Sequence, residues 1–138
     1  MRYIELSAAS IEQALSAYSP LAAGAGLVAL LPEAETDGLA LLQAACRRHG
    51  MALAGGIFPA LVERQHLVKK GAWLLYFEQM PPHFLLPAIN SVGESASQKV
   101  VAEVRACLKC FPADAQKPTL FMLFDGMVPN IASILDGI

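Results

Sequence analysis

Residues 72–77 read Ala72-Trp73-Leu74-Leu75-Tyr76-Phe77, and every one of these side chains is apolar or aromatic. An apolar run of this length without alternation is typical of a strand that is covered on both faces. Lys69-Lys70-Gly71 precedes it as a turn-like segment, and residues 60–68 come before that turn. We therefore predict a hairpin between residues 60–68 and 72–77, with the second arm in the centre of a sheet.

Further strands and helices alternate along the rest of the chain. Apolar runs predict strands at residues 2–6, 27–31, 51–54 and 119–124. Apolar residues at helical spacing predict four helices, which begin near the capping residues Ser10, Thr36, Ser95 and Asn130. Gly50 suits the left-handed position at the end of the second helix. The order, roughly βαβαβββαβα, predicts an α/β fold in which helices pack on a mixed, largely buried sheet, as a single domain over residues 1–138.

The composition limits the classes of partner. Hydrophobic residues make up 55% of the chain and charged residues only 16%, with a formal net charge of -2. A chain with so little positive charge lacks the basic surface that tracks phosphates, so we expect no nucleic-acid partner. The longest apolar stretch, residues 21–31, is too short to span a bilayer, and the N-terminus has no signal-peptide pattern. We therefore expect a cytoplasmic protein without a membrane partner.

Three motifs are better explained by structure than by chemistry. Gly24-Ala25-Gly26 precedes a predicted strand, whereas a dinucleotide-binding loop follows one. Cys107 and Cys110 are placed at the end of a predicted helix, where the helix dipole raises a thiol pKa, so a redox pair is disfavoured. The histidines, of which His83 lies in a predicted loop, have no metal-ligand spacing. We predict no metal site, no cofactor and no catalytic residue.

Two strand ends are candidates for a binding site. Gly55-Gly56-Ile57-Phe58-Pro59 ends one strand, where paired glycines either form a bend or bulge, or let a ligand approach the backbone. Phe124-Asp125-Gly126 ends another, and ligands of open α/β sheets bind beyond such ends. Asp125 either receives a ligand's ammonium group or forms a turn with its own backbone. Both readings remain open at each position.

The same two motifs also carry a family resemblance. Gly55-Gly56-Ile57-Phe58-Pro59, a long helix, and then Leu120-Phe121-Met122-Leu123-Phe124-Asp125-Gly126 with a trailing helix resemble the N-terminal portion of FIST (F-box and intracellular signal transduction) domains. The resemblance spans residues 51–138, and before that it is one of element order alone. It implies an intracellular sensory domain that binds small ligands such as amino acids. It also implies a C-terminal FIST portion, or a signalling partner, that follows this one.

Three functional hypotheses follow. The first is a ligand-sensing module, with a small polar molecule held near Gly55, Gly56, Asp125 and Gly126, and Phe58 or Trp73 as an apolar wall. The second is an assembly or adaptor module that associates with itself or with a partner through an apolar surface, which the low charge content favours. The third is a hydrolase-type enzyme that uses Asp125 or His83 as acid or base. The absence of a recognisable catalytic motif places it last.

Overall fold

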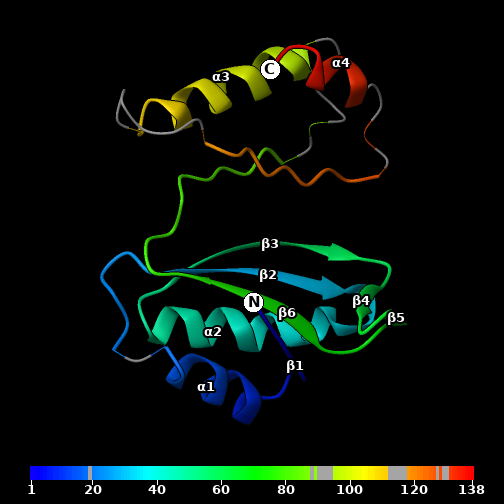
Figure 1. The fold of residues 1–138 in the computed structure, drawn as a ribbon. Coiled ribbons are helices and arrows are strands. Elements are labelled where there is room, and N and C mark those ends of the chain that lie inside the picture. Colours follow the sequence, from blue (N-terminus) through cyan, green and yellow to red (C-terminus); the bar gives the residue numbers. More distant parts are fainter. Residues whose placement is uncertain (19, 88, 90–94, 112–117, 127, 129–130) are drawn as a thin grey trace. The chain divides into compact units, whose positions relative to one another are not determined.

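The computed structural model describes residues 1–18, 20–87, 89, 95–111, 118–126, 128 and 131–138. These residues group into two compact units, Met1–Pro81 and Pro82–Ile138, which are described separately (Figure 1). Helices and a mixed sheet confirm the expected α/β class. The expectation of a single domain over residues 1–138 stays a prediction.

The first unit is built on a four-stranded sheet in the order β1-β6-β2-β3. Its strands are β1 (Arg2–Ile4), β2 (Gly26–Pro32), β3 (Ala52–Phe58) and β6 (Ala72–Phe77). β2 and β3 are parallel, while β6 is antiparallel to both β1 and β2. The sheet is therefore mixed, and the apolar run at residues 72–77 lies in its interior, as predicted.

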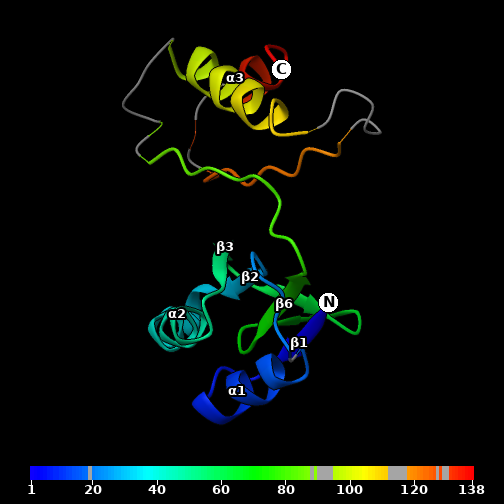
Figure 2. The ribbon, with the colours of Figure 1, turned by 90° about the vertical axis from the view of Figure 1, so that its left-hand side faces the viewer.

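Two helices pack on one face of this sheet, α1 (Ala8–Ser16) and α2 (Leu39–Arg48) (Figures 1 and 2). Ile11 and Leu42 from the helices meet Leu27, Leu31 and Leu74 from the sheet in one buried cluster. Val28 and Leu30, which alternate with these residues along β2, point to the opposite face and are only half-buried. The apolar run of β2 was expected to be covered on both faces, but within this unit the described helices cover one.

The helix ends show how local chemistry sets the boundaries. α1 begins earlier than predicted, because Ser7 rather than Ser10 is the N-cap and its hydroxyl accepts a bond from the Ser10 amide at 3.1 Å. Thr36 does not cap α2, since it lies in a 3-10 helix, η1 (Glu33–Gly38), that leads into α2. Gly50 takes a φ of +64° after the last turn, as predicted.

The predicted hairpin between residues 60–68 and 72–77 is wrong. The first of these segments folds on itself as β4 (Leu61–Glu63) and β5 (His66–Val68), a separate antiparallel pair. Arg64 and Gln65 make the turn with φ values of 44° and 70°, which matches a two-residue turn with both residues left-handed. β6 is thereby free to pair with β1 and β2.

The described residues of the second unit form two helices and segments without regular secondary structure. The helices are α3 (Ser95–Leu108) and α4 (Ile131–Leu135), and Val100, Val104, Val128 and Ile134 form a small buried cluster. Residues 119–124, predicted as a strand, form neither a helix nor a strand, so that prediction is wrong. Asn130, predicted to cap the last helix, lies outside the described residues.

Among the helices of the described residues, none has both the length and the apolar character needed to cross a membrane.

Candidate functional site

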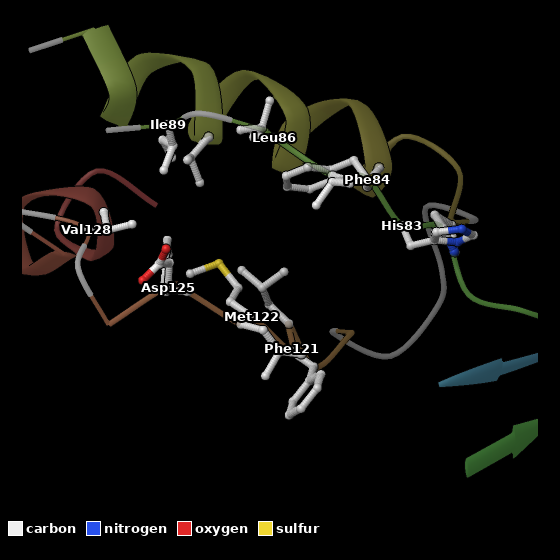
Figure 3. Close-up of a pocket in the computed structure, with 15 residues that line it drawn as sticks. His83, Phe84, Leu86, Ile89, Phe121, Met122, Asp125 and Val128 are labelled. Atoms are coloured by element: carbon white, nitrogen blue, oxygen red, sulfur yellow. The ribbon is translucent and has the colours of Figure 1, made fainter. Parts of the chain in front are cut away.

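The second unit contains a cavity of about 390 Å³, which lies among its irregular segments and helices (Figure 3). Ligand pockets commonly have volumes of about 300–1,000 Å³ and mostly apolar linings, so this cavity has the size and character of a small-molecule site. Its lining residues come from residues 82–89, from α3, and from residues 120–128: Pro82, His83, Phe84, Leu85, Leu86, Ile89, Val100, Cys107, Leu120, Phe121, Met122, Leu123, Phe124, Asp125 and Val128.

Two rows of apolar side chains face each other across the cavity. Figure 3 shows Phe84, Leu86 and Ile89 along one side and Met122 on the other, where the ring of Phe121 is turned away from the opposite segment. Both rows belong to segments that form neither a helix nor a strand. Consecutive residues of each segment, 82–86 and 120–125, border the cavity.

Asp125 supplies a carboxylate at one end of this cavity, near Val128 (Figure 3). The amide of Val128 donates a 3.0 Å hydrogen bond to the backbone carbonyl of Asp125, which makes a turn where this segment ends. A backbone turn therefore follows Asp125, and this residue is exposed to solvent at the cavity. A cation bound there would keep part of its hydration.

His83 lines the same cavity at its other end (Figure 3). A side chain that passes a proton to or from a reacting group must lie within hydrogen-bond reach of it, at about 2.6–3.2 Å. Because the imidazole and the Asp125 carboxylate stand at opposite ends, they do not form a directly bonded acid–base pair. The geometry favours recognition of two ends of a ligand over joint action on one bond.

Cys107 is the other reactive group of the lining. Burial raises the pKa of its thiol, and the nearby Cys110 and Glu103 raise that pKa further. The thiol therefore favours its neutral form, which is the less nucleophilic one. Cys107 acts here as a small apolar surface, in keeping with the packing role expected from the sequence, while Cys110 is exposed.

Gly55 and Gly56, predicted to admit a ligand, lie within β3 of the first unit. A Cβ atom added to Gly55 would stand 1.8 Å from the carbonyl oxygen of Ala29 on β2. The close approach of β2 thus explains the glycine at position 55. Gly56 pairs with Leu30 of β2, and Leu30 pairs on its other side with Trp73 of β6.

Phe58 and Trp73, the predicted apolar walls, are on strands of the first unit as well. Phe58 ends β3 in register with Pro32. The Trp73 indole donates a 2.9 Å hydrogen bond to the carbonyl of Val62, and its ring packs edge-on against Tyr3 with centroids 5.3 Å apart. Trp73 therefore fastens the β4–β5 hairpin to the sheet.

The predicted site residues are thus distributed over both units. Gly55, Gly56, Phe58 and Trp73 belong to the first, while Asp125 and Gly126 belong to the second. Of the six, Asp125 alone lines the cavity. Apart from its chain neighbours, no described residue lies within 4 Å of the position of a Cβ atom on Gly126.

Sequence reasoning missed the wall formed by Phe84 and Leu86. The prolines around them indicated a loop, and of the residues in that loop only His83 was weighed for a functional role. The signal was present in the apolar triplet Phe84-Leu85-Leu86, which an ordinary surface loop lacks. Among the described residues, no group of three or more His, Cys, Asp and Glu side chains is arranged to hold a metal ion.

Comparisons with known proteins leave the family open, since no protein-family model, no curated protein and no solved structure matches this chain. The resemblance to FIST domains stays a prediction.

Proposed function

We propose that this chain is a sensory module that binds a small molecule in the cavity of its second unit. The observation that carries the proposal is a cavity of about 390 Å³ with two facing apolar rows and a carboxylate, that of Asp125, at one end. Such a site fits a ligand with an apolar body and one cationic head. Amino acids with apolar side chains, which the FIST resemblance also implies, belong to this class.

The balance of energies assigns most of the affinity to the apolar rows. An ion pair between exposed groups contributes about 0–1 kcal/mol, because water screens both charges. Burial of an apolar side chain contributes about 1.5–3 kcal/mol. The exposed Asp125 carboxylate therefore selects for a cationic head, while side chains such as Leu86 and Met122 hold the ligand.

Signalling in this proposal follows from the two walls being separate segments of the chain. A ligand that contacts both Phe84 and Met122 bridges residues 82–89 to residues 120–128. It thereby favours the conformers in which the two segments stand at the right separation, and shifts the population toward them. A partner that recognises those conformers would read the signal.

A series of probes tests this proposal by isothermal calorimetry. Phenethylamine carries the ring and the ammonium group, hydrocinnamate carries the ring and a carboxylate, and L-phenylalanine carries all three. We expect phenethylamine and L-phenylalanine to bind and hydrocinnamate to bind more weakly. Asp125→Asn should remove this preference, whereas Asp136→Asn, at an exposed aspartate outside the cavity, should leave it unchanged.

Two results would count against the proposal. If none of the three probes binds the parent, the cavity does not hold this class of ligand. If hydrocinnamate binds as tightly as phenethylamine, the carboxylate of Asp125 has no part in selecting the ligand.

A second candidate function, an assembly or adaptor module, is favoured by exposed apolar side chains in the second unit. Leu85 is 85% exposed, Phe121 is 68% exposed and Leu135 is 51% exposed. Large apolar patches on a soluble protein mark surfaces that contact a partner. A hydrophobic dye should then bind the chain in the absence of any small ligand. Loss of this dye binding as the protein concentration rises would favour the assembly function, because association covers the exposed apolar side chains.

A further inference from the structure

The outer edge of the sheet in the first unit is formed by β3, none of whose residues lines the cavity. β3 is the last strand of its sheet (Figures 1 and 2), and among the described residues β2 is the strand that pairs with it. A strand at the edge of a sheet presents unpaired amide and carbonyl groups along one side. Such an edge can accept another strand.

The backbone direction of β3 follows from one hydrogen bond. The amide of Ala52 donates to the carbonyl of Ala25, next to β2, at 3.2 Å. Amide and carbonyl groups alternate in direction along a strand, so the even-numbered residues of β3 bond to β2. Leu53, Gly55 and Ile57 therefore direct their amides and carbonyls outward, away from β2.

β3 lacks the features that usually protect an edge. Natural sheets block their edges with short strands, charged side chains or prolines. The other edge strand, β1, fits this pattern because it has three residues and carries Arg2. β3 has seven residues, Ala-Leu-Ala-Gly-Gly-Ile-Phe, with no charge and no proline, and Ile57 is 47% exposed on it.

The sequence of β3 is complementary to itself in an antiparallel pair. With Gly55 opposite Gly55 of a second copy, Leu53 stands opposite Ile57 of that copy, and Ala52 stands opposite Phe58. All three outward-directed residues then form hydrogen-bonded pairs, because each exchanges its amide and carbonyl bonds with its opposite residue. No like charges meet, and apolar side chains pair on both faces.

We propose that β3 is a self-association surface, through which two copies of the chain join their four-stranded sheets into one continuous sheet. The two copies are related by a two-fold axis through Gly55. The exposed Gly55 has no side chain at this axis, so the two backbones meet there without steric conflict. A contact of this kind is closed, because each edge is used once.

The first test is sedimentation velocity of the full chain over a wide range of concentrations. We expect the parent to shift from the 14.7 kDa monomer to a species of twice that mass as concentration rises. Ile57→Lys should raise the dissociation constant by about tenfold or more, because each dimer loses two apolar pairs and gains two charges. Leu67→Lys is the matched control, since Leu67 is a strand residue that is 78% exposed on β5.

The second test reports the register. In a Cys110→Ser background, chains with Leu53→Cys and chains with Ile57→Cys are mixed and oxidised. Opposite residues in a hydrogen-bonded pair have Cα atoms about 5.5 Å apart, within reach of a disulfide. We expect cross-linked dimers in the mixture and a several-fold lower yield from either variant alone.

Three outcomes would overturn the proposal. The parent stays monomeric at every concentration, or Ile57→Lys associates as tightly as Leu67→Lys, or the mixture cross-links no better than the single variants. Circular dichroism of each variant shows whether the fold is kept. If Ile57→Lys is unfolded, the cross-linking result decides by itself.

Discussion

The carboxylate of Glu12 on α1 lies 2.9 Å from the ring Nε2 of His49, the C-cap residue that follows α2. Arg48 binds the other oxygen of the same carboxylate. One acidic side chain thus joins the two helices that cover the sheet, at the side of the helices that faces water. Because the groups are exposed, the contact orients α1 and α2 more than it stabilises them.

The first prediction concerns the pH dependence of this contact. The hydrogen bonds from His49 and then Arg48 lower the pKa of Glu12 below its ordinary value of 4.5. A lowered pKa means that the contribution is complete above pH 4.5 and is lost as the pH falls through the folded-state pKa. Glu12→Gln should therefore be less stable than the parent in urea unfolding at pH 7, and the difference should disappear at strongly acidic pH.

Glu103→Gln, at an exposed residue of α3, serves as the control for this experiment. The assignment would be contradicted if Glu12→Gln remained less stable than the parent by the same amount down to strongly acidic pH. At that pH the Glu12 carboxyl is protonated and uncharged, so it should stabilise the fold no more than the amide of glutamine does.

The second prediction concerns Gly55. An alanine there would place its Cβ atom against the Ala29 carbonyl, so the pairing of β2 with β3 would have to shift. We expect Gly55→Ala to lower the free energy of unfolding by about 2–4 kcal/mol, as measured by urea unfolding. Gly50→Ala is the comparison, because among the described residues other than its chain neighbours none lies within 4 Å of its Cβ position, and the backbone strain of its positive φ costs about 1–2 kcal/mol. Equal effects would show that β2 does not require the glycine.

The third prediction concerns the bond between Trp73 and Val62. Trp73→Phe keeps an aromatic ring against Tyr3 but removes the indole N–H. The Val62 carbonyl then loses this donor and must accept a hydrogen bond from water instead. The loss should be about 0.5–1.5 kcal/mol and should fall on the β4–β5 hairpin. Hydrogen exchange should be faster at the amides of residues 61–68 than in the parent. Tyr76→Phe, which changes a ring stacked on Tyr18, should leave these amides unchanged.

The fourth prediction compares two changes in the cavity. Met122→Ala removes apolar contact with the ligand, whereas Asp125→Asn removes one exposed charge. We expect Met122→Ala to weaken phenethylamine binding by about tenfold, and Asp125→Asn by at most about fivefold. If Asp125→Asn has the larger effect in calorimetry, then charge and not apolar contact holds the ligand.

The sequence predicts those elements that are determined by their own residues. The unbroken apolar run at residues 72–77 placed β6 inside the sheet, and Gly50 marked the end of α2 through its backbone freedom. Pairing partners are different, because they depend on competition between strands that are distant in sequence. Residues 60–68 were predicted to pair with β6. They form their own hairpin instead, with Arg64 and Gln65 in its turn, and β1 pairs with β6.

Of the predicted ligand-binding residues, Asp125 alone lies at the candidate site, for a related reason. A short polar residue at the end of an apolar run is visible in the sequence, but a cavity results from the way separate segments meet. Phe84 and Met122 are far apart along the chain, and no local pattern brings them together. Gly55 had two explanations of similar strength, and the position of Ala29 on the neighbouring strand favours the structural one.

The proposed function can be tested without any mutation, by finding which residues of the parent chain contact a bound amine. Phenethylamine is added to the isotopically labelled chain, and amide chemical shifts are followed by two-dimensional nuclear magnetic resonance. The account predicts that the amides of residues 82–87 and 120–128 shift with one common dissociation constant. Shifts confined to β3 and β6, around Gly56 and Trp73, would place the ligand on the first unit and contradict it.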